Sequence, residues 1–368
     1  MSVSGNTHFS PFREAFFRPQ NLICTYFRTF HVIITHMSEK YLVPLKMKPF
    51  CRETLWGGQR LRNDYHKPAP ADLANIAESW EISTHPNGMS CLDGGSIDAQ
   101  TFADYLWQAG PRVISPQSDS TEFPLIIKYI DAADTLSIQV HPGPGFYTTG
   151  PNRSGKTEMW YIVDAAPGSY IYYGVKEITD RTTLRQALQD DTLPELLRRI
   201  EVHPGDFFFI PPGTIHAIGA GILIAEIQQA CDVTFRVWDY GRIDASGKKR
   251  PLHLKEALMV SNLSPTPMVE AESLRHLTPT TTAQTLVTCP YFQVVRVRLD
   301  GKYTTQTSKA SFQILMCLEG HFSLTHESMI YTYNRGETAF LPAGLGDYTV
   351  EGEAELLLTQ LPSTDKNS

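Results

Sequence analysis

Short apolar segments separated by turn residues run along most of the chain and predict a protein built mainly from β-strands. Leu125–Ile130, Leu136–Val140 and Glu158–Val163 have strand length and many β-branched or aromatic residues, as buried strands do. Ser169–Tyr173 is expected to form a hairpin with Glu158–Val163. Gly and Pro, 25 of each in 368 residues, suit a turn-rich β fold better than a helical bundle.

One part of the first half changes from strand to helical spacing. Apolar residues recur three and four positions apart between residues 179 and 200, which indicates amphipathic helix. Pro194 fits near a helix start, where the missing amide hydrogen would be unpaired anyway. Thr101–Ala109 also has helical spacing. We therefore expect a helix at 101–109 and a helical insertion at about 176–202.

A weak internal repeat relates the two halves of the chain. Gly205–Pro211 reads GDFFFIP and Gly336–Pro342 reads GETAFLP, while Glu158–Asp164 aligns with Gln313–Glu319. The interval between the paired segments is longer in the first half, by about the length of the helical insertion. The repeat predicts two related β-barrels, with the insertion in or beside the first.

Local composition sets the expected domain boundaries. Residues 1–36 carry three arginines against one glutamate and show no hydrophobic period, so we expect an extension that is disordered or not native, with Met37 as the true start. A transit peptide is the alternative. We expect a first barrel over residues 37–265, a Pro/Thr/Ser-rich linker over 266–290 and a second barrel over 291–368.

Charge and cysteine content narrow the class of partner. The net charge of −7 disfavours a general nucleic-acid binder, and an anionic ligand would need local cations. The six cysteines form no CxxC pair, which is typical of a reduced cytoplasmic protein. Pro and Gly interrupt the longest uncharged apolar stretch, residues 207–225, so no membrane partner is expected. The oligomeric state, monomer or dimer, stays open.

Three short segments carry candidate metal ligands. Gln139 and His141 share one strand face, Lys156 and Glu158 share another, and His216 follows a Pro-Pro-Gly turn. Two imidazoles, a carboxylate and an amide oxygen can hold a divalent metal and leave room for a substrate oxygen. Ligand softness alone leaves Zn²⁺, Mn²⁺, Fe²⁺ and Co²⁺ open.

Each of these residues also has a simpler interpretation. The histidines could be hydrogen-bonded surface residues, Gln139 could cap a strand edge, and Glu158 could pair with Lys156 on the surface. The position of Glu158 inside an apolar strand favours the metal site, because an unpaired buried carboxylate is costly.

Basic residues inside apolar strands are candidates for binding an anion. Arg236 lies in such a strand, and an interior guanidinium needs an anionic partner from the substrate or the protein. The alternative is an edge pair with Asp232 or Asp239. Lys128 also lies inside an apolar strand. These two residues and Lys156 could supply the cations that a phosphorylated substrate requires.

Six segments together resemble the type I mannose-6-phosphate isomerases, particularly the shorter bacterial form. They are LWGG (55–58), ESWEIS (78–83), FPLIIKYIDAADTLSIQVHP (123–142), KTEMWYI (156–162), IPPGTIHAIG (210–219) and EIQQACDVTFRVWDYGR (226–242). They occur in this order, and the resemblance covers the chain from about residue 43 to 260. The resemblance implies a cupin (jelly-roll) architecture and an enzyme with one Zn²⁺ per chain. Such an enzyme interconverts mannose 6-phosphate and fructose 6-phosphate by proton transfer between C1 and C2 through an enediol.

The resemblance also implies roles for individual residues. The family's metal ligands fall on Gln139, His141, Glu158 and His216. Its active-site arginine falls on Arg236, which we expect to stabilise the developing negative charge. Lys156 matches the family's lysine two residues before the ligand glutamate and would shuttle a proton or position an oxygen. Our own hypothesis, apart from the resemblance, is that Lys128 binds the phosphate end of the substrate. In the second barrel Gln313 replaces the glutamate and Asp347 aligns with His216, so no metal site is expected there.

Two other functions remain possible for such a fold. A cupin dioxygenase would more often carry two histidines in an HxH pair, whereas this chain has Gln139-x-His141. A sugar-phosphate-binding protein without catalysis would not need both the full ligand set and Arg236. The isomerase is therefore the preferred hypothesis.

Overall fold

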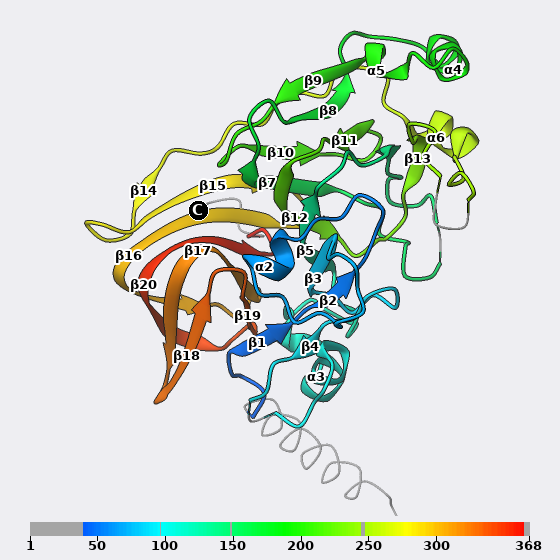
Figure 1. Cartoon of the computed structure of the whole chain (residues 1–368). Coiled ribbons are helices and arrows are strands. Elements are labelled where there is room, and N and C mark those ends of the chain that lie inside the picture. Colours follow the sequence, from blue (N-terminus) through cyan, green and yellow to red (C-terminus); the bar gives the residue numbers. More distant parts are fainter. Residues whose placement is uncertain (1–39, 96, 148, 244–246, 364–368) are drawn as a thin grey trace, which may run out of the picture. The chain divides into compact units, whose positions relative to one another are not determined.

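The computed structural model describes residues 40–363 except residues 96, 148 and 244–246 (Figure 1). The expectations for residues 1–36 lie outside this part of the chain. Strands dominate the described residues, which confirms a mainly β protein, and the strand pairs are antiparallel. None of the described helices is long and apolar enough to cross a membrane.

Two sheets are built from the first two thirds of the chain. The six-stranded sheet has the order β10 (Phe207–Ile210), β7 (Glu158–Ala165), β12 (Ile222–Gln229), β5 (Leu125–Ala132), β3 (Glu78–Ile82) and β2 (Phe50–Arg52). The five-stranded sheet has the order β13 (Phe235–Trp238), β6 (Ile138–Val140), β11 (His216–Ile218), β8 (Tyr170–Val175) and β9 (Leu197–Glu201). The strands β5 and β12 are buried at all eight positions, as expected for central strands covered on both faces.

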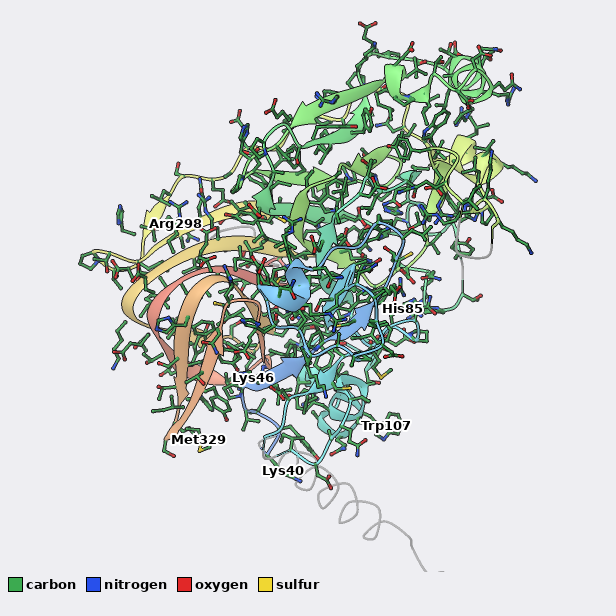
Figure 2. The ribbon with its side chains drawn as sticks, viewed as in Figure 1. Lys40, Lys46, His85, Trp107, Arg298 and Met329 are labelled. Atoms are coloured by element: carbon green, nitrogen blue, oxygen red, sulfur yellow. The ribbon has the colours of Figure 1, made fainter. Side chains whose placement is uncertain are left out.

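The third sheet has nine strands and combines two early strands of the chain with seven later ones. Its order is β14 (Arg275–His276), β15 (Thr282–Thr288), β16 (Gln293–Thr307), β20 (Gly346–Gln360), β17 (Gln313–His326), β19 (Thr338–Leu341), β1 (Leu45–Lys48) and β4 (Cys91–Leu92), with β18 (Met329–Asn334) paired to β17. Met329 marks the exposed end of β18 (Figure 2). Strand β1 pairs with β19, so an N-terminal strand completes a sheet made mostly from C-terminal residues.

The helices are few and short. They are α2 (Arg60–Asn63), α3 (Phe102–Ala109), the 3-10 helix η1 (Pro111–Val113), α4 (Arg181–Gln189), α5 (Leu193–Leu196) and α6 (Leu254–Val260). Helix α3 confirms the helix predicted at 101–109. Its first turn is closed by a capping box between Thr101 and Asp104. Its outer face carries Trp107, which is exposed (Figure 2).

The expected hairpin between Glu158–Val163 and Ser169–Tyr173 is wrong. Strand β7 pairs with β10 and β12, whereas β8 pairs with β9 and β11 in the other sheet. Trp160 of β7 and Tyr173 of β8 belong to one buried cluster. The two strands therefore pack face to face across a core, because β7 is buried on both of its faces and needs a covering sheet as well as neighbours.

The helical insertion expected at 176–202 is shorter than predicted. Helices α4 and α5 end at Leu196, and residues from Leu197 form the strand β9, which pairs with β8. Asp180 caps α4 by accepting a hydrogen bond from the Thr183 amide. The apolar spacing of Leu197 and Ile200 fits a helix. These residues form a strand instead, because they pair with the edge of β8 that β11 leaves open.

The stretch predicted as a linker, residues 266–290, also contains strands. It holds β14 and β15, and β15 pairs with β16. Its threonines look like linker composition, yet threonine is also a good strand residue. Residues from both halves, such as Tyr129 and Phe340, belong to one core, and Tyr129 donates a hydrogen bond to the carbonyl of Cys317. The predicted division into two barrels stays a prediction.

Candidate metal centre

Three strands of the five-stranded sheet place three functional side chains in one row. Gln139 of β6 lies opposite His216 of β11 on one side and opposite Arg236 of β13 on the other. Directly opposed residues of antiparallel strands project to the same face of the sheet. An imidazole, an amide and a guanidinium therefore stand side by side.

The six-stranded sheet contributes the carboxylate to this row. Glu158 begins β7, and its Oε1 lies 3.3 Å from Nε2 of His141, which directly follows β6. Its Oε2 lies 3.6 Å from Nε2 of His216. The candidate ligand atoms of these three residues all lie within 4.8 Å of one another. Three of the four predicted ligands therefore converge in the buried space between two sheets.

The fourth predicted ligand, Gln139, touches the same centre. Its Nε2 lies 3.4 Å from Nε2 of His216. A half turn of the amide plane exchanges nitrogen and oxygen, which differ little in shape. The Oε1 atom of Gln139 can thus face the centre and act as a ligand.

Backbone carbonyls orient both imidazoles toward the centre. Nδ1 of His141 lies 2.9 Å from the carbonyl oxygen of Val233, and Nδ1 of His216 lies 2.8 Å from that of Thr214. In the neutral ring, Nδ1 then carries the hydrogen and donates it, which leaves Nε2 unprotonated and able to act as a ligand. In His141 this atom lies 3.3 Å from Nζ of Lys156. Metal-binding histidines are held by outer hydrogen bonds of this kind.

The residues fit a divalent metal because the Glu158 carboxylate is buried while its oxygens still have unused acceptor positions. Its side chain is 1% exposed, and neither oxygen has a hydrogen-bond partner with acceptable geometry among the described residues. Its close charged neighbour is Lys156, with Nζ 2.7 Å from Oε1. A buried carboxylate with open lone pairs between two oriented imidazoles is the donor set of a catalytic zinc site.

The pKa values of Glu158, His141 and His216 also suit metal binding. Burial alone would raise the pKa of Glu158, but the charge of Lys156 and the two imidazoles hold it well below its usual value. Burial, with the neighbouring His141, lowers the pKa of His216 to about 3. Burial and the charge of Lys156 lower the pKa of His141. The three ligands are thus an ionised carboxylate and two neutral imidazoles, as metal binding requires.

A cavity of about 330 Å³ opens beside this centre. Four predicted site residues line it, namely Lys128, Gln139, Lys156 and Arg236. The space therefore has one candidate ligand, Gln139, and the three predicted cations among the residues that line it. The structure thus brings together the site residues that are more than 100 positions apart in sequence.

The cations of this cavity differ in how their charges are balanced. Nζ of Lys128 lies 3.5 Å from Glu78 and 3.3 Å from Glu226. Arg236 has no carboxylate within ion-pair distance among the described residues. Its guanidinium donates to the carbonyl of Pro251, and its buried Nε lacks a partner. Arg236 is therefore open to an anion from outside the chain.

The alternative partners expected for Arg236 are engaged elsewhere. Asp232 accepts a hydrogen bond from Asn87 and pairs with Arg52 at 3.5 Å. Asp239 pairs with Arg242 and Arg250. The edge ion pair considered for Arg236 is thus not formed.

Several cavity residues were missed by the sequence reasoning. Glu226 had the same signal as Glu158, a carboxylate inside an apolar strand, and it lines the cavity on β12. Arg250 and His253 also line it, but they come from the irregular segment between β13 and α6, which has no periodic signal. Asp232 lies in the matched stretch 226–242 and lines the same wall.

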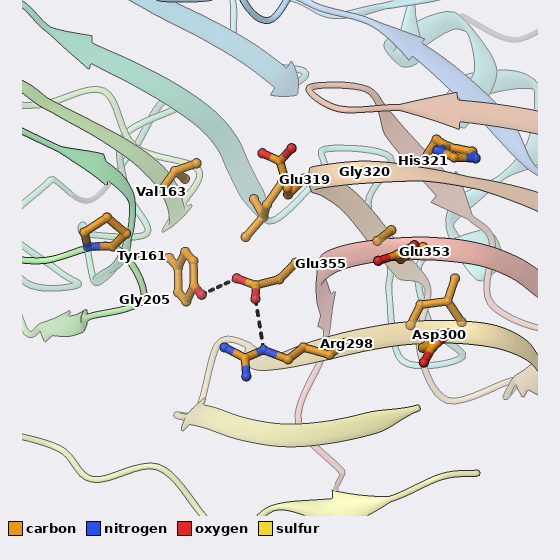
Figure 3. Close-up of a pocket in the computed structure, with 14 residues that line it drawn as sticks. Tyr161, Val163, Gly205, Arg298, Asp300, Glu319, Gly320, His321, Glu353 and Glu355 are labelled. Carbon is orange, nitrogen blue, oxygen red and sulfur yellow. Dashed lines mark hydrogen bonds and ion pairs between the residues drawn. The ribbon is translucent and has the colours of Figure 1, made fainter. Parts of the chain in front are cut away.

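A larger cavity, about 710 Å³, lies apart from the metal centre (Figure 3). In this cavity Tyr161 of β7 donates a hydrogen bond to Glu355, which also pairs with Arg298 at 3.1 Å. None of the candidate metal ligands lines it. Cavity size alone therefore does not locate the chemistry of this molecule.

Comparisons with known proteins give one consistent result. The family described as "Phosphomannose isomerase type I, catalytic domain" matches residues 44–149, and "Mannose-6-phosphate isomerase, cupin domain" matches residues 282–361. Mannose-6-phosphate isomerase ManA of Bacillus subtilis (strain 168) is 37% identical over 322 residues, covering 86% of this chain and 99% of that protein. A mannose-6-phosphate isomerase of Streptococcus mutans is 34% identical and covers 85% and 97%.

Solved structures agree with these sequence relatives. The crystal structure of mannose 6-phosphate isomerase from Bacillus subtilis matches with a TM-score of 0.79 and 31% identity, covering 86% of this chain and 99% of that chain. A mannose 6-phosphate isomerase solved with zinc and yttrium bound matches with a TM-score of 0.66 at 16% identity, covering 87% of this chain and 100% of the other. The latter similarity concerns the fold alone.

Proposed function

This chain belongs to the type I mannose-6-phosphate isomerase family, and we propose that its reaction takes place beside the centre of His141, Glu158 and His216. The enzyme interconverts mannose 6-phosphate and fructose 6-phosphate. This reaction moves a proton between C1 and C2 through an enediol. The observation that carries the choice of site is the buried Glu158 carboxylate, which lies between two oriented imidazoles and whose oxygens accept no hydrogen bond of acceptable geometry from the described residues.

We propose that the centre holds one Zn²⁺ per chain, with Gln139 as the fourth ligand. Mixed nitrogen and oxygen donors deep in the protein suit zinc, and a three-residue His/Glu/His set is a known catalytic arrangement. Bound zinc would polarise the oxygens of the substrate as a Lewis acid. The cavity beside Gln139 gives the substrate access to that position.

Arg236 is the proposed partner of the negative charge that develops on the substrate oxygen. Its position opposite Gln139 in the strand register places it next to the metal ligands. Because its buried Nε has no partner in the part of the chain that the structure describes, the guanidinium can bind a new anion without first breaking an ion pair. A fixed donor of this kind needs little reorganisation during the reaction.

Lys156 is proposed to position a substrate oxygen as a charged donor. Burial would lower its pKa, but the charges of Glu158 and Glu226 raise it above the usual value. A proton held this firmly favours positioning over proton abstraction. Lys128 lines the same cavity, and its charge is already balanced by Glu78 and Glu226. We therefore propose that Lys128 contacts hydroxyl groups of the sugar rather than its phosphate.

The cytoplasm remains the proposed compartment. The five described cysteines, at positions 51, 91, 231, 289 and 317, are free thiols. Free thiols are typical of a reducing compartment. The family comparisons match isomerases, so neither the dioxygenase nor the non-catalytic sugar-phosphate-binding protein is favoured.

The deciding experiment combines metal analysis with a coupled assay for fructose 6-phosphate. His216→Ala removes one imidazole ligand and should reduce bound zinc and turnover at least about a hundredfold, because an incomplete ligand set holds the ion poorly. His203→Ala is the matched control, since the side chain of His203 is 73% exposed and outside the centre. Wild-type turnover in a folded, zinc-free His216→Ala protein would refute the proposed centre.

A further inference from the structure

We propose that the C-terminal half carries a second ligand site, for an uncharged polyhydroxylated molecule such as an unphosphorylated sugar. The site is a cavity of about 440 Å³ on one face of the nine-stranded sheet. No candidate metal ligand of the catalytic centre lines it. The proposal therefore does not depend on the function proposed for that centre.

The strand period builds the cavity from a single face of the sheet. Gln293 and Val295 of β16 line it at alternate positions, as do Leu356, Leu358 and Gln360 of β20. Alternate residues of a strand project to the same side. The space is thus a feature of the sheet itself rather than a gap between loops.

Three glutamines form a continuous polar row along one wall. Gln360 lies opposite Gln293 on β16 and opposite Gln313 on β17. Nε2 of Gln313 donates to Oε1 of Gln360 over 3.1 Å, and Nε2 of Gln360 donates to Oε1 of Gln293 over 2.8 Å. Tyr348 closes the row by donating its hydroxyl hydrogen to Oε1 of Gln313 over 2.7 Å.

The row retains hydrogen-bonding capacity for a ligand. An amide nitrogen carries two hydrogens, and each glutamine donates one of them, either to another glutamine of the row or to Thr288. The second hydrogen of each amide can bind a hydroxyl or ring oxygen. Hydroxyl-rich molecules match a series of neutral amide donors at regular strand spacing.

The remaining walls are apolar and aromatic. Val295, Leu315, Val350 and Leu356 line the space together with the ring of Tyr303. A wall of this kind accepts the C–H face of a sugar ring, while the amides meet its hydroxyls. Binding sites commonly combine such apolar walls with a few convergent polar groups, and 440 Å³ lies in their usual size range.

Charge excludes other ligand classes from this cavity. Its charged lining residues, Glu272 and Arg275, are both exposed and of opposite sign. A phosphate would need unbalanced cations, and the described residues form no group of three metal-ligating side chains here. Gln313 occupies the position that Glu158 takes in the first half of the repeat, so a neutral amide stands where the catalytic half has a carboxylate.

The open space is itself informative. Protein interiors are close-packed, and a purely structural core would fill such a volume with aliphatic side chains. Phe322, Leu324 and Tyr333 fill the rest of the same buried cluster, to which the cavity residues Val295, Leu315, Val350 and Leu356 also belong. The cavity interrupts that packing where the glutamine row begins.

Binding of methyl α-D-mannopyranoside to the full-length zinc enzyme tests the proposal. This neutral glycoside cannot ring-open, so it is not a substrate. We expect ligand-detected NMR to show binding in the millimolar range, and methyl resonances of Val295, Leu315 and Val350 to shift on titration. The double variant Gln313→Leu/Gln360→Leu should weaken binding about tenfold or more by removing two amide donors.

Gln306→Leu is the matched control, because Gln306 lies on β16 but does not line the cavity. It should leave binding unchanged, and all variants should keep wild-type turnover of mannose 6-phosphate. If the glycoside fails to shift the three methyl groups, the proposal is wrong, whether or not the double variant folds. Equal binding of the glycoside by wild type and by a folded double variant would also overturn it. So would shifts of these methyl resonances that 1-octanol produces and the glycoside does not.

Discussion

At the scale of single residues, two buried glutamates in neighbouring strands show how surroundings divide their roles. Burial raises the pKa of Glu226, and the charge of Glu158 raises it further. For Glu158, Lys156 and the imidazoles outweigh burial and lower the pKa. The same residue type in the same strand context is thus a permanent anion at one position and holds a proton more readily at the other.

Arg236→Ala tests the charge that we assign to this side chain. The variant should keep its zinc, since Arg236 is not a ligand, and lose about a hundredfold in kcat, the usual effect of removing one stabilising donor. Steady-state kinetics and metal analysis measure both. Arg298→Ala, at an exposed position remote from the centre, should keep wild-type kcat. A rise in KM alone would instead assign Arg236 to substrate binding.

Asp239 makes the stability of the cavity wall depend on pH. Burial opposes ionisation, but hydrogen bonds from Arg250 and Arg242 hold the pKa of Asp239 below its ordinary value of 3.8. A depressed pKa contributes stability above the ordinary value, and that contribution is lost as the pH falls through the folded-state pKa. Asp239→Asn should therefore destabilise the protein by about 1–3 kcal/mol at pH 7.

Urea unfolding at several pH values measures this effect. The difference in free energy of unfolding between wild type and Asp239→Asn should shrink as the pH falls below 3.8. Asp134→Asn, at a side chain that is 65% exposed, serves as the control and should change stability little. A difference that stays constant down to pH 2 would show that Asp239 does not titrate with folding.

At the scale of elements, the connection between β6 and β7 begins and ends at residues of the candidate site. It leaves β6 through His141 and enters β7 through Lys156 and Glu158. Gly155 makes the last turn with φ of +69°, a conformation that side chains rarely adopt. A Cβ atom there would lie 2.4 Å from the backbone nitrogen of Pro144. The backbone turn that precedes Lys156 therefore requires a glycine at position 155.

Gly155→Ala should move Lys156 and lower kcat about tenfold or more, because small displacements of a positioning group are costly. Activity assays and thermal melting together measure the change. Gly145→Ala is the matched control, since Gly145 also has a positive φ of +85° but nothing within 4 Å of its added Cβ. The control should lose some stability and keep kcat. Equal kcat values for both variants would contradict the proposed role of the close contact.

At the scale of the whole molecule, a buried ion pair connects the N-terminal segments with the nine-stranded sheet. Nζ of Lys67 lies 2.6 Å from Oε1 of Glu81 and also donates to the carbonyl of Gly336. Thr338 of β19 donates to the other oxygen of Glu81 over 3.0 Å. Together with β1 in the nine-stranded sheet, these contacts make the stability of the two halves interdependent.

Lys67→Met should cost about 3–5 kcal/mol, because it leaves the Glu81 carboxylate buried without its cation. Guanidinium chloride unfolding measures this loss, and Lys67→Met/Glu81→Leu should recover part of it. Lys302→Met is the control, since Lys302 and Glu351 form an exposed pair at 4.0 Å worth little. A loss equal to that of the control would mean that the pair does not join the two halves.

Much of the site could be predicted from individual residues and their spacing. The period of two placed Gln139 and His141 on one face, and the apolar context of Glu158 marked a carboxylate with a function. The residues Arg250 and His253 could not be predicted in this way, because irregular segments carry no periodic signal that relates them to a strand. Their place in the cavity follows only from how the chain after β13 folds back.

The amino-acid sequence by itself determined the mainly β class, the helix at 101–109, the family and the types of the candidate metal ligands. Only the tertiary structure decided that β7 and β8 lie in different sheets, that β1 completes the C-terminal sheet and that Nε of Arg236 has no hydrogen-bond partner among the described residues. The physical reason is that strand periodicity records which side chains share a face. It does not record which distant strand supplies the neighbour, since that choice depends on burying both faces of every central strand at once.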